Sequence, residues 1–135
     1  MFKKHNFLAN ITNDLFDDTD LRKFFYEIDY EKFSFSEGKL DEFKGSDQER
    51  HLDALLYRYN LLGRLVRMKV LRRTEIEFMF FEMTQVFKNA EVSKYLSWLE
   101  REYVQYGGIG KNTRKRPYDD ARWLIEELSK RKRNA

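Results

Sequence analysis

The sequence has no cysteine, one proline and six glycines in 135 residues. Without cysteine it can form no disulfide, thiolate metal site or cysteine nucleophile. So few glycines and prolines argue against an all-β fold, which needs many turns. No apolar run approaches the roughly 20 residues that cross a bilayer. The first 16 residues also lack the apolar stretch of a signal peptide, because Asn10, Asn13 and Asp14 interrupt it. We therefore expect a soluble, cytoplasmic protein.

Aromatic residues, in contrast, are plentiful. They make up 16% of the chain, with 12 Phe and 8 Tyr. Such side chains bury large areas, so a chain of this length can form one core without disulfides. Apolar residues recur at three and four positions along most of the chain, the spacing typical of helices. The expected fold is an all-α, single-domain bundle of five or six helices that spans residues 1–135.

Residues 46–89 are predicted to form a central pair of helices joined by a tight corner. Ser46 followed by Glu49 is the pattern of a capping box at a helix start. Gly63 lies inside the first helix, where it costs about 1 kcal/mol relative to Ala. We expect this glycine to let another backbone approach closely. The second helix is expected to begin near Thr74.

Shorter helices are predicted on both sides of this pair. Amphipathic spacing places two before it, over residues 6–16 and 19–30, and two after it, over residues 90–106 and about 118–132. Residues 31–46 are less regular and are expected to form a loop. This loop should place four apolar side chains under the core, namely Phe33, Phe35, Leu40 and Phe43.

A set of spaced residues in this region resembles a bacterial helical family. The set comprises Leu62, Gly63, Leu65 and Val66, then Val70 and Leu71, then Ile76, Phe80 and Phe81, and finally Tyr95, Trp98 and Leu99. The pattern is similar to that of domain-of-unknown-function family 4760. It covers roughly residues 46–128, with the acidic segment LFDDTDLRKFFYEID as its first part.

The chain departs from this family at Val70, where a small residue, usually glycine, is expected before the corner leucine. The corner is therefore expected to be built differently here. Many members of the family carry a membrane helix upstream, which this sequence does not show. The resemblance implies a helical fold and supplies no catalytic residue or cofactor.

Charge is distributed unevenly along the chain. Residues 1–50 carry 8 Lys or Arg against 12 Asp or Glu, whereas residues 111–135 carry 9 against 4. The last helix and tail, residues 117–135, are basic. If the basic clusters converge on one face, they could neutralise phosphates of a nucleic acid. These candidate anion contacts are Arg64, Arg67, Arg72, Arg73, Lys111, Arg114, Lys115 and Arg116.

Three other interpretations of the basic clusters are open. The cluster at the corner could pair with the acidic N-terminal half of the chain. Basic residues near a helix C-terminus also complement the helix dipole. Binding to an anionic membrane surface is a third alternative, although the basic helix has only a modest apolar face.

No stretch carries a convincing catalytic or cofactor-binding pattern. GGIGKNT, residues 107–113, lacks both the first glycine and the final Ser or Thr of a phosphate-binding loop, and it indicates a helix end. The acidic group Asp17, Asp18 and Asp20 lacks the remaining ligands of a calcium loop. Neither histidine has a second histidine one turn away, so helical zinc signatures are absent. We expect no enzymatic activity, no metal, no cofactor and no small-molecule substrate.

The surplus of aromatic residues favours a role in protein interaction. A small bundle is expected to leave some of them uncovered, and the candidates for a protein interface are Phe78, Phe81, Trp98 and Trp123. An exposed apolar patch of more than a few hundred Å² would support this role. The leading hypothesis is a non-enzymatic protein-interaction or regulatory module that binds a protein partner or forms a homodimer. The alternative is a nucleic-acid-associated protein.

Overall fold

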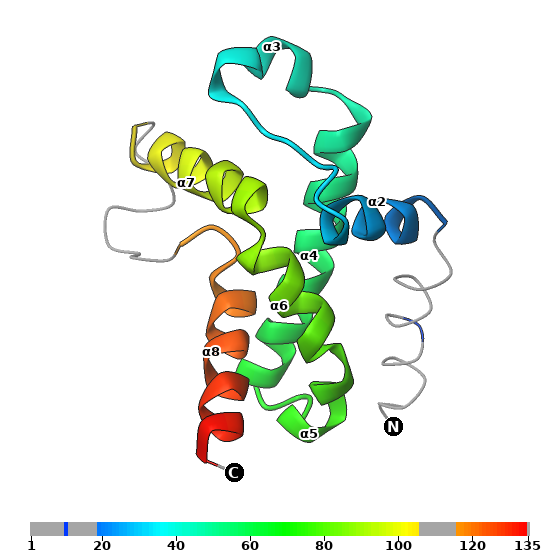
Figure 1. The fold of residues 1–135 in the computed structure, drawn as a ribbon. Coiled ribbons are helices and arrows are strands. Elements are labelled where there is room, and N and C mark those ends of the chain that lie inside the picture. Colours follow the sequence, from blue (N-terminus) through cyan, green and yellow to red (C-terminus); the bar gives the residue numbers. More distant parts are fainter. Residues whose placement is uncertain (1–9, 11–18, 106–115, 135) are drawn as a thin grey trace.

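The computed structural model describes residues 10, 19–105 and 116–134. This part of the chain is all-α, as predicted, and it contains no strand (Figure 1). Five helices have nine or more residues: α2 (Thr19–Asp29), α4 (Asp47–Arg67), α6 (Phe80–Lys88), α7 (Ala90–Gln105) and α8 (Asp119–Asn134). The expected helix over residues 6–16, apart from residue 10, and the expected helix end at residues 107–113 lie outside the described residues. None of the helices described is long and apolar enough to cross a membrane.

Helix α4 is the centre of the bundle. Figure 1 shows that the axes of α4, α6 and α8 are roughly parallel, with α6 running opposite to the other two, while α2 and α7 cross them. The hydroxyl Oγ of Ser46 accepts a hydrogen bond from the backbone N–H of Glu49 at 3.2 Å, as a capping residue should. The Glu49 carboxylate accepts from the N–H of Gly45 at 2.8 Å. Both side chains of the predicted capping box therefore cap this helix start. Glu49, however, binds the N–H of the residue before Ser46, whereas a capping box uses the N–H of the N-cap residue itself.

Gly63 marks a close contact between α4 and α8 (Asp119–Asn134). A Cβ atom at this position would lie 2.2 Å from the carbonyl oxygen of Asp120 on α8, so no side chain fits there. One turn earlier, Asn60 Oδ1 accepts a hydrogen bond of 3.0 Å from the N–H of Ala121. The predicted close approach of a second backbone is confirmed, and the partner is the first turn of α8.

The second helix of the central pair is not continuous. It consists of α5 (Arg73–Ile76), the 3₁₀ turn η2 (Glu77–Met79) and α6. Side chains three residues apart eclipse one another in a 3₁₀ turn. Ile76 and Met79 are therefore both directed into the core, where each is almost fully buried. The prediction of one helix was wrong in this detail.

The corner after α4 is closed by backbone hydrogen bonds. Lys69 adopts the left-handed conformation, with φ of 63°. The N–H of Val70 then donates to the carbonyl oxygen of Leu65 at 2.9 Å, which ends the helix. The position in this corner that favours glycine is thus Lys69, directly before Val70.

Residues 31–46 place their aromatic side chains under the core, as predicted. The segment includes η1 (Glu37–Lys39) and α3 (Leu40–Phe43), and Phe33, Phe35 and Phe43 are buried. The ring of Phe35 meets those of Phe43, Tyr95 and Trp98, with centroids 5.2, 5.5 and 5.9 Å away. This aromatic cluster fixes the segment against α7.

Asn89 connects three helices. Its Oδ1 accepts from the N–H groups of Glu91 at 2.9 Å and Val92 at 3.0 Å, which caps the start of α7. Its Nδ2 donates to the carbonyl oxygen of Ile28 in α2 at 3.2 Å. Asn89 therefore holds the break between α6 and α7 against the end of α2.

Candidate functional site

Two of the four predicted interface residues are exposed. Phe78 in η2 is 56% exposed, and Phe81 in α6 is 68% exposed. Trp98 is only 8% exposed, because residues 31–46 fold over it, so the prediction that the bundle leaves it uncovered was wrong. Trp123 is half-buried beside two guanidiniums. Its ring centroid lies 4.8 Å from Cζ of Arg67 and 5.8 Å from Cζ of Arg73.

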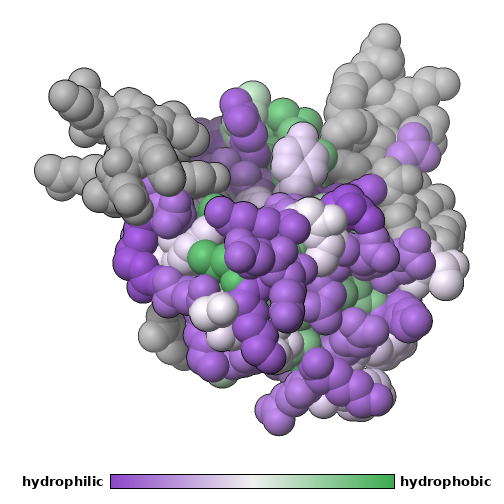
Figure 2. All heavy atoms as spheres, turned by 90° about the horizontal axis from the view of Figure 1, so that it is seen from above, coloured by the Kyte–Doolittle hydropathy of each residue, from purple (hydrophilic) through white to green (hydrophobic). Residues whose placement is uncertain are grey.

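Two further exposed aromatic residues, which the sequence analysis missed, lie on α2 and directly after it. Tyr26 and Tyr30 are stacked with ring centroids 6.1 Å apart. Gln85 Nε2 on α6 donates to Asp29 Oδ1 on α2 at 3.2 Å, so the two helices adjoin. Seen from the end that carries α3, the surface is mostly hydrophilic, with hydrophobic residues only in small separate spots (Figure 2).

Two of the corner arginines form ion pairs with acidic side chains of α8. Arg67 forms ion pairs with Asp119 at 3.1 Å and Asp120 at 2.7 Å. Arg73 pairs with Glu127 at 3.1 Å. In the part of the chain that the structure describes, the two corner arginines with ion pairs therefore pair with acidic groups of α8 and not with the N-terminal half.

Arg116, just before α8, belongs to the same network. It binds Asp119 at 2.8 Å and Glu126 at 3.0 Å. Burial alone would raise the pKa of Asp119, but its hydrogen bonds to Arg116 and Arg67 lower that pKa below the usual value. Arg64 and Arg72 are exposed, and the remaining predicted contacts lie outside the described residues, namely Lys111, Arg114 and Lys115.

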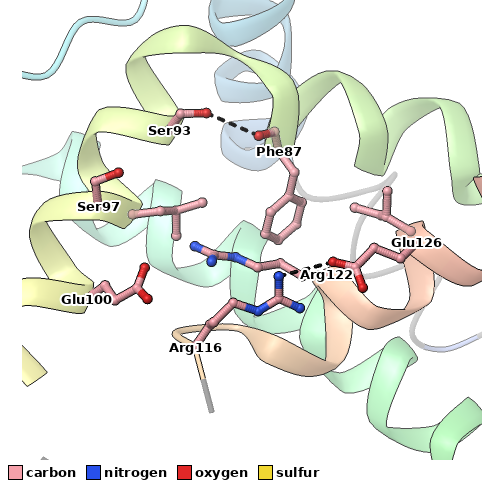
Figure 3. Close-up of a pocket in the computed structure, with 9 residues that line it drawn as sticks. Phe87, Ser93, Ser97, Glu100, Arg116, Arg122 and Glu126 are labelled. Carbon is pink, nitrogen blue, oxygen red and sulfur yellow. Dashed lines mark hydrogen bonds and ion pairs between the residues drawn. The ribbon is translucent and has the colours of Figure 1, made fainter. Parts of the chain in front are cut away.

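A polar pocket of about 300 Å³ lies between α7, α8 and the end of α6 (Figure 3). Its apolar lining comes from one residue of each helix, Phe87, Leu96 and Ile125. Its polar lining consists of Ser93, Ser97, Glu100, Arg116, Arg122 and Glu126. No residue of the pocket is a histidine or cysteine, so the serines have no adjacent imidazole base. The arrangement suits binding better than nucleophilic catalysis.

Arg122 is the polar group of this pocket that the sequence analysis missed. Burial lowers the pKa of its guanidinium, and the positive charge of Arg116 lowers it further, while Glu100 and two other carboxylates partly offset this. Figure 3 shows the Arg122 side chain extending towards α7, whereas Arg116 is joined to Glu126. Within the described part of the chain, the Arg122 side chain has no ion pair or hydrogen bond. One signal was present in the sequence: Arg122 directly follows Ala121 and precedes the apolar pair Leu124 and Ile125.

A second, larger hollow lies between α2 and the start of α4. It measures about 560 Å³ and contains three acidic and three basic side chains, Asp20, Glu27, Asp47, Lys23, Arg50 and His51. The closest approach between His51 Nε2 and Asp20 Oδ2 is 3.9 Å, a weak contact. Among the residues that the structure describes, no group of acidic, histidine or cysteine side chains could hold a metal ion.

A hydrogen-bonded cluster joins α4 to α7 and to the residue just before α8. Asp53 Oδ1 on α4 accepts from the hydroxyls of Tyr95 on α7 at 2.5 Å and Tyr118 at 3.2 Å, just before α8. Burial raises the pKa of the Asp53 carboxyl above its usual value, although both tyrosine hydrogen bonds oppose that rise. The cluster fixes the relative positions of three helices.

Comparison with protein-family models, curated proteins and solved structures finds no significant match to this chain. The resemblance to the helical family therefore stays a prediction.

Proposed function

We propose that this chain is a non-enzymatic interaction module that binds a protein partner through the surface formed by Phe78 and Phe81. The partner to test first is a second copy of the chain. The observation that carries the proposal is the exposure of two phenylalanine rings one turn apart, at 56% and 68%. We refer to this surface as the Phe78–Phe81 surface.

Two neighbouring exposed rings favour association because burying them removes apolar area from water. The gain is about 25 cal/mol per Å² of apolar surface, before the entropy of association is subtracted. Aromatic side chains also dominate the binding energy of many interfaces. In a homodimer with two-fold symmetry the same surface faces itself, so two equivalent phenylalanine pairs can pack together. Tyr26 on the adjoining helix α2 and Tyr30 directly after it provide further exposed aromatic surface.

Association with nucleic acid is the alternative, and the geometry gives it less support. Arg67, Arg73 and Arg116 already form ion pairs with carboxylates of α8. Binding phosphates through them would require these pairs to break. Regulation through a protein contact needs no such change.

The test measures molar mass by light scattering over a range of protein concentrations, at low and high salt. We expect the mass to rise towards that of a dimer, with little effect of salt because the surface is apolar. Replacement of both residues, Phe78→Ser with Phe81→Ser, should keep the chain monomeric. The control is Tyr57→Ser, which removes an exposed aromatic ring from α4 and should leave association unchanged.

Two outcomes would count against the proposal. If the native chain is monomeric at every concentration, self-association is excluded. If the double variant associates as strongly as the native chain, another surface is responsible. Material that carries nucleic acid until salt removes it would favour the alternative.

A further inference from the structure

We propose that the pocket between α7 and α8 binds a small organic acid with one carboxylate, and that Arg122 is the residue that holds the carboxylate. The site is separate from the Phe78–Phe81 surface, since none of its lining residues belongs to that surface. The inference goes beyond the proposed function and does not depend on it.

The two arginines of the pocket differ in what they already bind. Arg116 contacts Asp119 and Glu126, so its charge is compensated twice. Arg122 is half-buried, and its side chain has no ion pair or hydrogen bond in the described part of the chain. A partly buried guanidinium without a partner is costly, and a carboxylate that fits its planar fork would remove this cost. Glu100, Asp119 and Glu126 offset its charge only in part and from a distance, so the donors of Arg122 stay open to a bound anion.

The lining indicates an organic anion and not an inorganic one. Phe87, Leu96 and Ile125 supply apolar surface beside the arginine. A small ligand that presents a carboxylate to Arg122 can place an apolar group against these three side chains. Ligand pockets typically combine such an apolar lining with a few polar groups that fix orientation. The volume of about 300 Å³ is at the lower end of their range, so the ligand is small.

Glu100 limits the charge that the ligand can carry. Its carboxylate lies on the α7 side of the pocket, towards which the Arg122 side chain extends (Figure 3). A doubly charged phosphate would meet repulsion there, whereas a single carboxylate can face Arg122 and avoid it. The Ser97 hydroxyl lies one turn before Glu100 on α7 and is available as a second donor. Together these groups favour a monocarboxylate.

The test uses benzoate as the probe and benzamide as its uncharged analogue. Binding is followed by isothermal titration calorimetry and by amide chemical shifts of the full chain. We expect benzoate to bind and to shift resonances of α7 and α8, and benzamide to bind at least about tenfold more weakly. This ratio follows because a hydrogen bond to a charged group contributes roughly 1.5–3 kcal/mol and 1.4 kcal/mol corresponds to a factor of ten.

Three variants separate the role of Arg122 from general charge effects. Arg122→Gln should weaken benzoate binding by about tenfold or more. Arg58→Gln makes the same charge change on α4, where Arg58 binds the carbonyl of Ala54, and should leave binding unchanged. Glu100→Gln should strengthen binding by about threefold, because it removes a nearby exposed negative charge. This last variant changes an exposed side chain, so its result does not depend on how well Arg122→Gln folds.

Several results would overturn the assignment. Equal binding of benzoate and benzamide would show that the pocket binds the apolar ring and makes no contact with the carboxylate. Unchanged binding by Arg122→Gln, or weaker binding by Glu100→Gln, would contradict the proposed contacts. Inorganic phosphate that competes as well as benzoate would replace the organic acid by a phosphate as the ligand class.

Discussion

Helix α8 meets α4 and α7 in opposite ways. Against α4 the backbones nearly touch, because Gly63 has no side chain and the Asp120 carbonyl occupies the space where one would be. Against α7 the helices stay apart and enclose a pocket of about 300 Å³. The first contact is closed by a small residue and by the Asn60 hydrogen bond to Ala121. The second is lined by long charged side chains, among them Arg122 and Glu126.

The difference shows how one helix can serve both stability and binding. The distance between packed helices depends on the side chains at the contact, and Gly63 permits the short distance between α4 and α8. The close contact with α4 holds α8 in place, and the pocket can then keep polar groups that a closed interface would exclude. A rigid support of this kind is what a binding site requires.

The largest effect is expected from closing the space at Gly63. Gly63→Ala would place a Cβ atom 2.2 Å from the Asp120 carbonyl oxygen, and backbone cannot move aside as cheaply as a flexible side chain can. Overpacking of this kind outweighs the gain in helix propensity, so we expect a net loss of about 2 kcal/mol. Urea unfolding measures the loss as a lower midpoint with an unchanged slope.

Gly38→Ala provides the matched control for that substitution. A Cβ atom there would meet only Ser36 Oγ at 3.6 Å, an ordinary contact. We expect the free energy of unfolding to change by less than about 0.5 kcal/mol, as for most surface substitutions. If both variants lose the same stability, the contact between α4 and α8 is not as tight as the structure indicates.

A smaller effect, visible only as a pH dependence, is expected from Asp53, which joins α4 to both Tyr95 and Tyr118. Burial raises the pKa of this carboxyl in the folded chain above its usual value of 3.8. The folded state therefore binds more protons than the unfolded state between these two pKa values. Stability contributed by protonated Asp53 is present below pH 3.8 and is lost as the pH rises through the folded pKa, at no more than about 1.4 kcal/mol per pH unit.

Asp53→Asn removes this titration and keeps an oxygen that can accept a tyrosine hydrogen bond. The difference in unfolding free energy between the native chain and the variant should shift in favour of the variant as the pH rises through that window. Asp119 titrates in the opposite sense because its pKa is lowered, and it is present in both chains, so the comparison cancels it. A difference that stays constant with pH would contradict the raised pKa of Asp53.

Most of the helices could be predicted because their signals are local. Ser46 with Glu49 and the apolar spacing of α4 act within a few residues, and both are confirmed by the structure. The break at η2 was missed because a 3₁₀ turn and an α-helix share the spacing of Ile76 and Met79. Trp98 was placed on the surface wrongly, since the segment that covers it is distant in sequence.

The candidate site was harder to predict because it depends on contacts between distant segments. The runs of basic residues drew attention to Arg67, Arg73 and Arg116, yet these are neutralised by acidic groups of α8. Arg122 stands alone in the sequence, and only the packing of α7 against α8 gives it a pocket. A single partly buried arginine is therefore harder to recognise from the sequence than a run of exposed basic residues.

The smallest effect is expected at the two left-handed residues that flank the contact between α4 and α8. Lys69 follows α4 with φ of 63°, and Tyr118 precedes α8 with φ of 55°. Lys69→Gly should stabilise the chain by about 0.5 kcal/mol, since relief of the left-handed strain exceeds the added freedom of the unfolded chain. Tyr118→Gly relieves the same strain but loses the hydrogen bond to Asp53, so it should destabilise by about 1 kcal/mol. Urea unfolding measures the change in unfolding free energy of each variant. Changes of opposite sign would show that Lys69 serves only to turn the chain, whereas Tyr118 also holds α8 to α4. A loss of stability in Lys69→Gly would contradict this distinction.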